Sequence, residues 1–475
     1  MRRHTYVARW LGPAHGFTAP LEARGAYFAL GEHVCLESRM PAGAGELLCA
    51  ATAGGRVHLA ALPIPSPTTA ERRRVLFLDL LEVAHLDGVE QRLGKPVKHE
   101  ANPIVTPRTV AAQRGQPVRP LGAPRVWRQD RSLRMELGAR GPMGNGVTGW
   151  LESDDGLAWR WSRDLPPHLV VDGEPDVDGE CCVTWFHDVD ESRPERRYKG
   201  ALIRGNWIRN RRRWLVTSGD AVRWHTEGQM EGMHHLKEHG GPCFRDPATG
   251  EYVAIGRTSA SGHRALGMLH SDDLIHWHGE VALLDVDDPY GRPAGLWRGQ
   301  YVAGRILDPA GERDADQIYW GTVWPEHGLY LCVYGRYRWD ARYEGALAVS
   351  RDGQNFMRIK NGEAILPCGA AGEWDSGTIF MDYGVTRPVP FPDQGIVRLY
   401  YAGSTWRHGA DPFRVPAAVG AADLREDGWA YLQAAPDATL PAVVITIPIQ
   451  ARSAAMLQVN AEGPLRWEFL DAATG

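Results

Sequence analysis

The chain has 475 residues, of which 43% are hydrophobic and 23% are charged, and its formal net charge is −5. This composition is that of a soluble globular protein, and the slightly acidic balance argues against nucleic acid or an anionic membrane as partner. Its seven cysteines include no Cys-x-x-Cys pair, which indicates neither a zinc site nor a disulfide framework. No apolar run is long enough to cross a membrane, and none follows Met1–His4, so we expect a cytoplasmic protein without a signal peptide.

Residues 1–95 are expected to form short strands separated by glycine and proline turns. Gly25–Leu30 and Glu46–Ala50 are examples. The apolar segment Val75–Ala84 fits either a strand or a short helix, because periodicity does not separate the two over this length. Residues 98–105 then form a connector into the next domain.

From about residue 115 to residue 435 one turn phrase recurs, in which Ser and Asp precede an aromatic residue. It occurs as Ser153–Trp159, Ser271–Trp277 and Ser350–Phe356, and in looser form as Ser218–Trp224 and Leu424–Trp429. An Asp-Gly turn between two β-like runs predicts a hairpin, and each copy follows a comparable set of strands. The repeat predicts five four-stranded units.

Radial repetition of such units makes a β-propeller. We therefore predict an all-β chain with a five-bladed β-propeller over residues 96–435. Residues 1–95 and 436–475 would supply an accessory β-sandwich, since forty residues are few for a domain of their own. A β-sandwich or β-helix with coincidental turns is the alternative.

The two ends of such a ring differ. At one end, here called the loop end, the innermost strands begin and the second and third strands connect. The other end, here called the turn end, carries the first hairpin turns and the Ser-x-Asp turns. Asp246, in the Arg245-Asp246-Pro247 phrase typical of fructan-cleaving enzymes, runs into Ala248–Gly250 and is best explained as a turn residue at the turn end. We expect the same structural role for Asp155, Asp220, Asp273 and Asp352.

Other carboxylates are predicted at the loop end, where loops on rigid strands can carry function. Cleavage of a glycosidic bond needs two carboxyl groups, one as proton donor and one as base or nucleophile. Glu238 with Asp375 is the first predicted catalytic pair, and Glu344 and Glu373 are the alternates, with acid and base not assigned. A solvated loop carboxylate is the competing interpretation of each. The predicted substrate-binding residues are His239, Asp178, Asp316, Trp374 and Arg264.

No metal or cofactor is expected. His234, His235 and His239 lie near Glu231 and Glu238, but the spacing is not that of His-Glu-x-x-His or a comparable metal motif. There is also no glycine-rich phosphate loop and no Gly-x-Ser-x-Gly elbow. A histidine that hydrogen-bonds a sugar hydroxyl is the favoured interpretation of the cluster.

Several phrases resemble the five-bladed β-propeller superfamily of glycoside hydrolases that includes families 32, 43, 68 and 130. They are Asn102–Val105, Arg197–Lys199, Ser350–Gly353, Gly372–Gly377 and Arg398–Tyr401. The combination is most similar to bacterial family-32-like proteins with strands before the propeller and a β-sandwich after it, over about residues 75–465. Two features depart from the pattern: Gln116–Pro120 has no carboxylate where families 32 and 43 have one, and Glu180-Cys181 falls in the second unit rather than the third.

The resemblance implies a glycoside hydrolase that acts on an oligosaccharide, a furanoside by superfamily habit, with the carboxylate pair in the axial pocket. A non-catalytic carbohydrate-binding propeller and a glycoside phosphorylase, as in family 130, are the alternatives. The expected partner is a carbohydrate substrate, with no nucleic acid and no membrane, and a homo-oligomer is left open.

Overall fold

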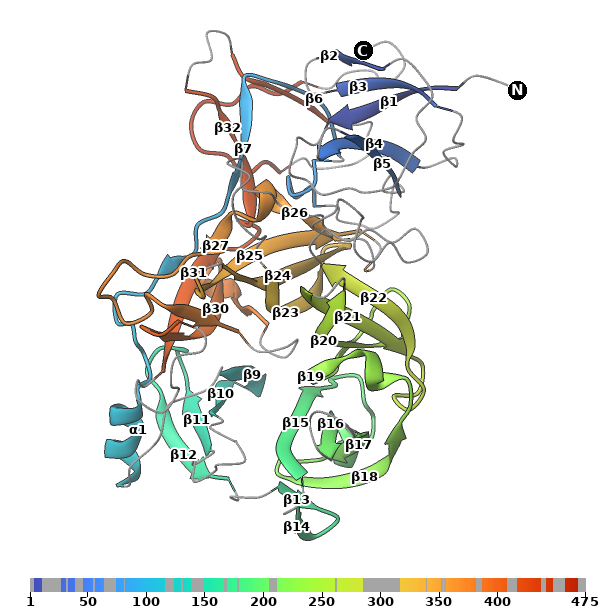
Figure 1. The fold of residues 1–475 in the computed structure, drawn as a ribbon. Helices are drawn as coiled ribbons and strands as arrows, with labels where there is room; N and C mark the ends of the chain where they lie inside the picture. Colours follow the sequence, from blue (N-terminus) through green and yellow to red (C-terminus); the bar gives the residue numbers. More distant parts are fainter. Residues whose placement is uncertain are drawn as a thin grey trace.

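The computed structural model is nearly all β in the residues that it describes (Figure 1). These residues are 4–10, 27–30, 33–38, 46–53, 56–63, 74–80, 82–115, 124–129, 131–137, 149–165, 169–176, 179–204, 212–260, 263–284, 317–338, 340–351, 353, 356–381, 387–407, 417–436, 441–446 and 458–468. Within these ranges no helix is both long and apolar enough to span a membrane.

The N-terminal strands form one five-stranded sheet in the order β2-β3-β1-β4-β5, in which β1 and β4 run parallel. The strands are β1 (His4–Trp10), β2 (Tyr27–Leu30), β3 (His33–Ser38), β4 (Glu46–Ala53) and β5 (Arg56–Pro63). The short strands expected in this region are therefore confirmed.

The prediction of a strand or short helix over Val75–Ala84 is wrong. Its described residues form a turn, and β6 (Val83–Asp87) begins only at its end. The segment is apolar because Leu76 and Leu78 are buried in the main hydrophobic core without regular backbone pairing. The side-chain amide of Gln91 donates to the carbonyl oxygens of Phe77 and Leu78, at 2.6 and 2.7 Å, and so satisfies backbone groups that a strand would have paired.

Units 1 to 3 are antiparallel meanders, as predicted. Unit 1 consists of β9 (Arg125–Gln129), β10 (Ser132–Leu137), β11 (Gly149–Ser153) and β12 (Arg160–Asp164). Unit 2 consists of β15 (Gly179–His187), β16 (Tyr198–Arg204), β17 (Arg212–Ser218) and β18 (Arg223–Met230). Unit 3 consists of β19 (Lys237–Arg245), β20 (Tyr252–Ala260), β21 (His263–Ser271) and β22 (His278–Leu284). A hairpin that was not predicted, β13 (Leu169–Val171) with β14 (Glu174–Asp176), extends unit 2 beyond β18.

Units 4 and 5 share one continuous sheet. Unit 4 consists of β23 (Gln317–Glu326), β24 (Leu329–Tyr337), β25 (Tyr343–Ser350) and the short outer strands β26 (Met357–Arg358) and β27 (Ala364–Leu366). Unit 5 has an innermost strand in two pieces, β28 (Thr378–Phe380) and β29 (Val389–Phe391), followed by β30 (Ile396–Ser404) and β31 (Ala418–Arg425). Both β28 and β29 pair with β30.

The outermost strand of unit 5 comes from before unit 1. β8 (Val97–Lys98) pairs with β31, whereas the predicted repeat, in which each recurring turn leads into the last strand of its unit, assigns this position to the strand after the Leu424–Trp429 turn. That strand, β32 (Ala430–Ala434), instead pairs with β7 (Val89–Leu93), and β33 (Val443–Thr446) pairs with β6. The expectation was wrong because the connector supplies a strand. The division at residues 95 and 435, and the shared terminal sandwich, stay predictions.

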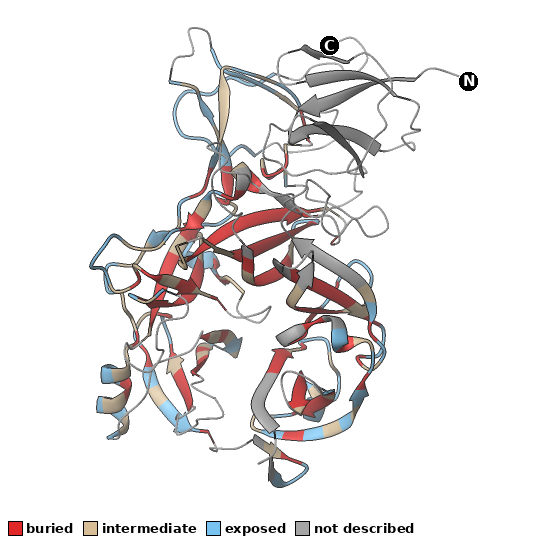
Figure 2. Cartoon of the chain, in the orientation of Figure 1, coloured by how far each residue is buried: buried red, intermediate tan, exposed pale blue. Residues whose placement is uncertain are grey.

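Each unit contacts the next around a closed ring, and unit 5 contacts unit 1. The buried residues follow the strands of this ring (Figure 2). The contacts between units are Trp127 against Trp185, Arg213 to the Gly240 carbonyl, Tyr330 hydroxyl to Asp246, Tyr343 paired with Thr378, and Tyr400 hydroxyl to the Gly156 carbonyl. An all-β chain of the propeller type is therefore confirmed, while the exact number of blades stays a prediction.

The helix α1 (Pro107–Arg114) was not predicted. Thr106 caps it by accepting the backbone N–H of Thr109, and Thr109 reaches back to the Thr106 backbone N–H, which makes a capping box. Pro107 occupies the first turn, and Gly115 ends the helix at φ 72°. The other helical turns in the described part of the chain are short 3₁₀ segments at Pro194–Arg196, Met233–His235, Ile359–Gly362 and Pro392–Gln394.

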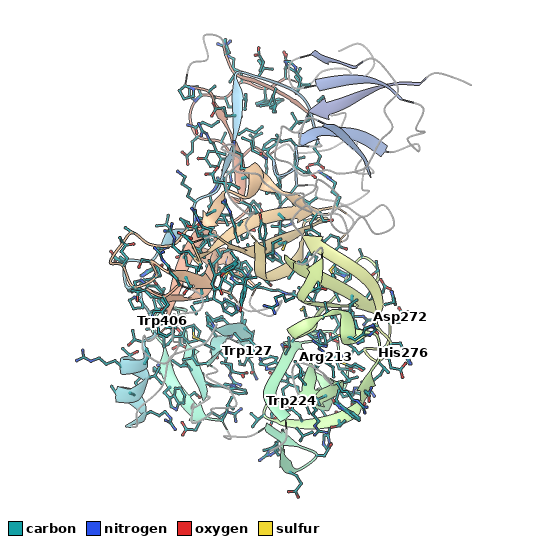
Figure 3. The ribbon with its side chains drawn as sticks, viewed as in Figure 1. Trp127, Arg213, Trp224, Asp272, His276 and Trp406 are labelled. Carbon is teal, nitrogen blue, oxygen red and sulfur yellow. The ribbon has the colours of Figure 1, made fainter. Side chains whose placement is uncertain are left out.

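Three of the four aspartates predicted to be structural in the recurring turn, Asp155, Asp220 and Asp273, bond to the backbone of their own turn, as predicted. In unit 1, Asp155 Oδ1 accepts the backbone N–H groups of Leu157 and Ala158, both at 2.8 Å. Burial acts to raise the pKa of Asp155, but these hydrogen bonds outweigh it and lower that pKa. The turns of Asp220 and Asp273 repeat the arrangement, and Figure 3 places Asp272 and His276 of the latter turn at the outer edge of unit 3. Asp352 lies outside the described residues.

Asp246 is also a turn residue, which confirms its structural interpretation. Its Oδ1 accepts the backbone N–H of Ala248 at 2.8 Å, and both carboxylate oxygens lie within 2.9 Å of the Tyr330 hydroxyl of unit 4. Asp246 is 4% exposed. The Arg-Asp-Pro phrase therefore joins two units at the turn end.

Candidate functional site

Three of the four predicted catalytic carboxylates lie at the loop end where units 4 and 5 join: Glu373 and Asp375 approach each other, and Glu344 lies on the adjoining strand of unit 4. They are Glu344, at the start of β25, and Glu373 and Asp375, in the loop between β27 and β28. We call these three residues the carboxylate cluster. The side chains of Glu238, His239 and Arg264 and all of Asp178 and Asp316 lie outside the described residues.

The loop before β28 is folded tightly by its own hydrogen bonds. Glu373 Oε2 accepts the backbone N–H of Ala370 at 2.7 Å, and the Gly377 N–H donates to the Ser404 carbonyl of β30 at 2.9 Å. A Cβ at Gly369 would overlap both Oδ1 of Asp375 and Oε2 of Glu373. The two carboxylate oxygens therefore converge on the same side of Gly369, and a side chain at position 369 would displace them.

Asp375 is the most buried member of the cluster, at 1% exposed. Its Oδ2 pairs with the Lys98 ammonium at 2.7 Å and accepts the Tyr401 hydroxyl at 3.0 Å. Trp374 lies over Tyr401, with ring centroids 5.7 Å apart and planes 19° from parallel. Lys98 comes from β8 and Tyr401 from β30, so the position of Asp375 depends on two other strands of unit 5.

Burial raises the pKa of the Tyr401 phenol, and the negative charge of Asp375 raises it further. The phenol therefore stays protonated and donates to the carboxylate. The negative charge of Glu373 raises this pKa in the same direction.

Glu344 reaches the cluster from unit 4. It is 7% exposed and pairs with Arg338 Nη1 at 3.1 Å. Next to it, the Cys368 thiol donates to the Tyr343 carbonyl at 3.0 Å. Burial raises the pKa of the Cys368 thiol to about 12; the charges of Glu344 and Asp375 add to this, and those of Lys98 and Arg342 oppose it. Cys368 is thus no thiolate nucleophile at neutral pH.

These contacts define what the cluster can do chemically. Glu373 is exposed, whereas Asp375 is buried against a cation and a phenol. Two carboxyl groups close together in such different surroundings suit separate roles, one in proton transfer and one in stabilising positive charge.

Sequence reasoning missed the residues that hold the carboxylates. Lys98 was placed in a connector, and nothing in the sequence links it to Asp375, which lies 277 residues further on. Tyr401 belongs to Arg398–Tyr401, which was noted as a strand and as part of the family resemblance, with no role in the site predicted for the tyrosine. Nothing in the sequence indicated that Arg338 pairs with Glu344, apart from its position six residues before it.

One group among the described residues has the arrangement of metal ligands. Glu326, His327 and Asp427 lie together at the turn end of unit 4, with His327 Nε2 3.0 Å from Glu326 Oε1 and 3.2 Å from Asp427 Oδ1. The Arg74 guanidinium donates to Asp427 and to Glu426 and supplies a positive charge there. This group is therefore explained as an ion-pair network that anchors the segment before β6.

No family model matches the sequence, and no curated protein matches it. Solved structures similar to the chain include a glycosyl hydrolase from Bacteroides ovatus, with 15% identity over 69% of this chain and 94% of that one, at a TM-score of 0.41. A β-1,2-mannobiose phosphorylase from Listeria innocua is 13% identical over 69% and 96%, at a TM-score of 0.43. A thermostable family-43 glycoside hydrolase is 12% identical over 68% and 96%, at a TM-score of 0.42.

Proposed function

We propose that this protein hydrolyses a glycosidic bond of an oligosaccharide at the carboxylate cluster. The observation that carries the proposal is the convergence of Glu373 and Asp375 on Gly369. Glycoside hydrolysis by the common mechanism uses two carboxyl groups on either side of the scissile bond, and close pairs are those of retaining enzymes. The pair Glu373 and Asp375 is now our first choice, in place of the predicted pair Glu238 and Asp375. Glu238 and Glu344 become the alternates.

The roles follow from the surroundings of each carboxylate. Glu373, exposed at the loop end, would donate the proton to the leaving oxygen as the glycosidic bond breaks, and would later take a proton from the water that forms the new bond to the anomeric carbon. Asp375 would stabilise the positive charge that develops on the sugar ring in the transition state. Lys98 and Tyr401 would hold Asp375 in place. The proposed sugar-binding residues are Trp374, His239, Asp178, Asp316 and Arg264.

The test compares turnover of aryl furanosides and aryl pyranosides by the wild type and by Glu373→Gln and Asp375→Asn. We expect each substitution to lower kcat at least about 100-fold, the usual contribution of a positioned proton-transfer group. Asp154→Asn is the matched control, because Asp154 is a carboxylate at the turn end whose side chain is 77% exposed, and its turnover should equal that of the wild type.

Each other outcome overturns a defined part of the proposal. Turnover that survives both substitutions would exclude this pair, and repeating the assay with Glu238→Gln would then test the first alternate. Turnover that requires inorganic phosphate would make the protein a glycoside phosphorylase. Sugar binding without turnover on any substrate would make it a carbohydrate-binding propeller.

A further inference from the structure

Arg387 reaches across the axis of the ring. It lies between β28 and β29, the two pieces of the innermost strand of unit 5. Its Nη2 donates to the carbonyl of Cys243 in β19, the innermost strand of unit 3, at 3.0 Å. Units 3 and 5 are not neighbours in the ring, so their innermost strands face each other only across the axis. The Arg387 side chain therefore lies at the axis.

The Arg387 guanidinium packs against an aromatic side chain. It lies over the ring of Phe244, 4.9 Å from the centroid, and Phe244 is 3% exposed. Arg387 itself is half-buried, so part of its surface remains open to a ligand. Burial lowers the pKa of its guanidinium to about 10, and the Cys243 thiol opposes this only in part. The group is therefore still positively charged at neutral pH, at a cost in desolvation.

Two other largely buried arginines are neutralised by carboxylates. Arg398 donates to both oxygens of Asp423, at 2.6 and 2.8 Å, and Arg351 donates to both oxygens of Asp79, at 2.6 and 2.9 Å. Arg387 differs, because no carboxylate among the described residues pairs with it. A carbonyl and a ring face attract a cation without neutralising it, and a buried charge without a counter-ion is costly. A group in this state indicates a ligand.

The other N–H groups of Arg387 suit one class of anion. A guanidinium has five N–H donors, and the Cys243 carbonyl uses one of them. Phe244 covers a face of the planar group, whereas the N–H groups point outward in its plane. Two parallel N–H groups match the two oxygens of a carboxylate. The aromatic surroundings strengthen such a pair, because they exclude water from one side.

We propose that Arg387 binds a small carboxylate at the axis of the ring. Arg387 supplies one positive charge, and a carboxylate neutralises it. A phosphate group with two negative charges would leave one of them beside the Phe244 ring without a partner. The carboxylate cluster lies at the loop end before β28, whereas Arg387 lies beyond β28 toward the turn end. Binding at Arg387 needs no catalytic activity, so the proposed function can fail without affecting it.

Isothermal titration calorimetry of the full chain with sodium acetate tests the proposal, with sodium phosphate as the second probe. Sodium chloride of equal ionic strength is the background, and the pH is mildly alkaline so that phosphate carries close to two negative charges. We expect saturable binding of acetate by the wild type and weaker binding of phosphate. Arg387→Met should lower the affinity for acetate at least about tenfold, because hydrogen bonds to charged groups contribute this much or more.

Arg128→Met is the matched control. The Arg128 guanidinium also donates to one carbonyl, that of Pro390, at 3.2 Å, and lies 5.4 Å from a phenylalanine ring, that of Phe391. Arg128 is exposed, however, so solvent stabilises its charge without a ligand. This variant should bind acetate like the wild type. Absence of acetate binding by the wild type, tighter binding of phosphate than of acetate, or the same loss in both variants would overturn the proposal.

Thermal unfolding separates ligand binding from a purely structural role of Arg387. Acetate should raise the Tm of the wild type above its value in chloride and leave the Tm of Arg387→Met unchanged, because a ligand stabilises only a folded state that binds it. An equal rise in both proteins would show that Arg387 only connects units 3 and 5, and would overturn the proposal.

A second variant covers the case in which Arg387→Met does not fold. Arg387→Lys keeps the positive charge but does not present a planar pair of N–H groups. It should therefore bind acetate more weakly than the wild type. An unchanged affinity for acetate in Arg387→Lys would refute binding by the guanidinium.

Discussion

Replacing Lys98 by Met should destabilise the protein by about 2–3 kcal/mol. The ammonium lies 2.7 Å from Asp375 Oδ2, and the side chains are 28% and 2% exposed. At an effective dielectric constant of about 20 the attraction at this distance is about 6 kcal/mol, an upper limit before desolvation. Removing one partner of a fully buried pair costs about 3–5 kcal/mol. The exposed part of Lys98 and the remaining hydrogen bond from Tyr401 lower our expectation to the stated range.

Urea unfolding followed by tryptophan fluorescence measures this loss, since Trp374 neighbours Asp375. Val97→Ala is the control: Val97 is the other residue of β8 and is 70% exposed, so its replacement should cost less than about 0.5 kcal/mol. The double variant Lys98→Met/Asp375→Asn should lose less than the two single losses together, by about 1–3 kcal/mol. If Lys98→Met costs no more than Val97→Ala, the ion pair does not hold Asp375, and our account of the site is refuted.

Three further predictions concern acid stability, the turn end and the loop of the cluster. Burial opposes ionisation of Glu191, but hydrogen bonds from the Arg193 backbone and from Lys199 lower its pKa to about 2. The ionised carboxylate therefore contributes its full stabilisation above the ordinary pKa of 4.5, and this stabilisation is lost as the pH falls toward 2. Glu191→Gln should therefore flatten the curve of unfolding free energy against pH in this range. Asp246→Ala should cost about 1–3 kcal/mol of stability in thermal unfolding, because it removes an acceptor of the Tyr330 hydroxyl. It should leave kcat unchanged, because Asp246 lies at the turn end. A large fall in kcat would contradict the structural role. Gly369→Ala should lower both Tm and kcat, and an unaltered variant would show that the two carboxylates do not converge there.

The repeated units could be predicted because their turns are local. Ser153 and Asp155 accept hydrogen bonds from backbone N–H groups within three residues of themselves, so the same short sequence forms the same turn wherever it occurs. The phrases therefore marked the last turn of units 1 to 3, although the strand after the Leu424–Trp429 turn lies outside unit 5. For the same reason, the tight turn directly after Asp246 was enough to exclude this residue from the catalytic candidates.

The parts that were missed depend on contacts distant in the sequence. β8 has only two residues, and no hydrophobic pattern marks it as a strand, yet it pairs with Ala422 and Asp423 more than 300 residues later. Helix α1 is different, because Thr106, Pro107 and Gly115 are the ordinary signals for the start and end of a helix, so this helix was predictable from local sequence.

The candidate site was predictable in position but not in geometry. Topology places Glu344 and Asp375 at the loop end, because one starts a third strand and the other precedes an innermost strand. Their surroundings depend on Lys98 and Arg338, whose relation to the carboxylates exists only after folding. Sequence reasoning therefore gave candidates without partners, and acid and base roles depend on partners.

The closing strand joins the stability of the ring to the arrangement of the site. Asn102 continues the pairing of β8: its side-chain amide donates to the Ala421 carbonyl at 2.8 Å and its Oδ1 accepts the Ala421 N–H at 2.9 Å. Lys98, on the same segment, holds Asp375. Loss of this pairing would open the ring and release the carboxylate together, whereas a change at the turn end, such as Asp246→Ala, would weaken the ring alone. Variants of residues 97–105 should therefore lose activity in proportion to stability, and turn-end variants should not.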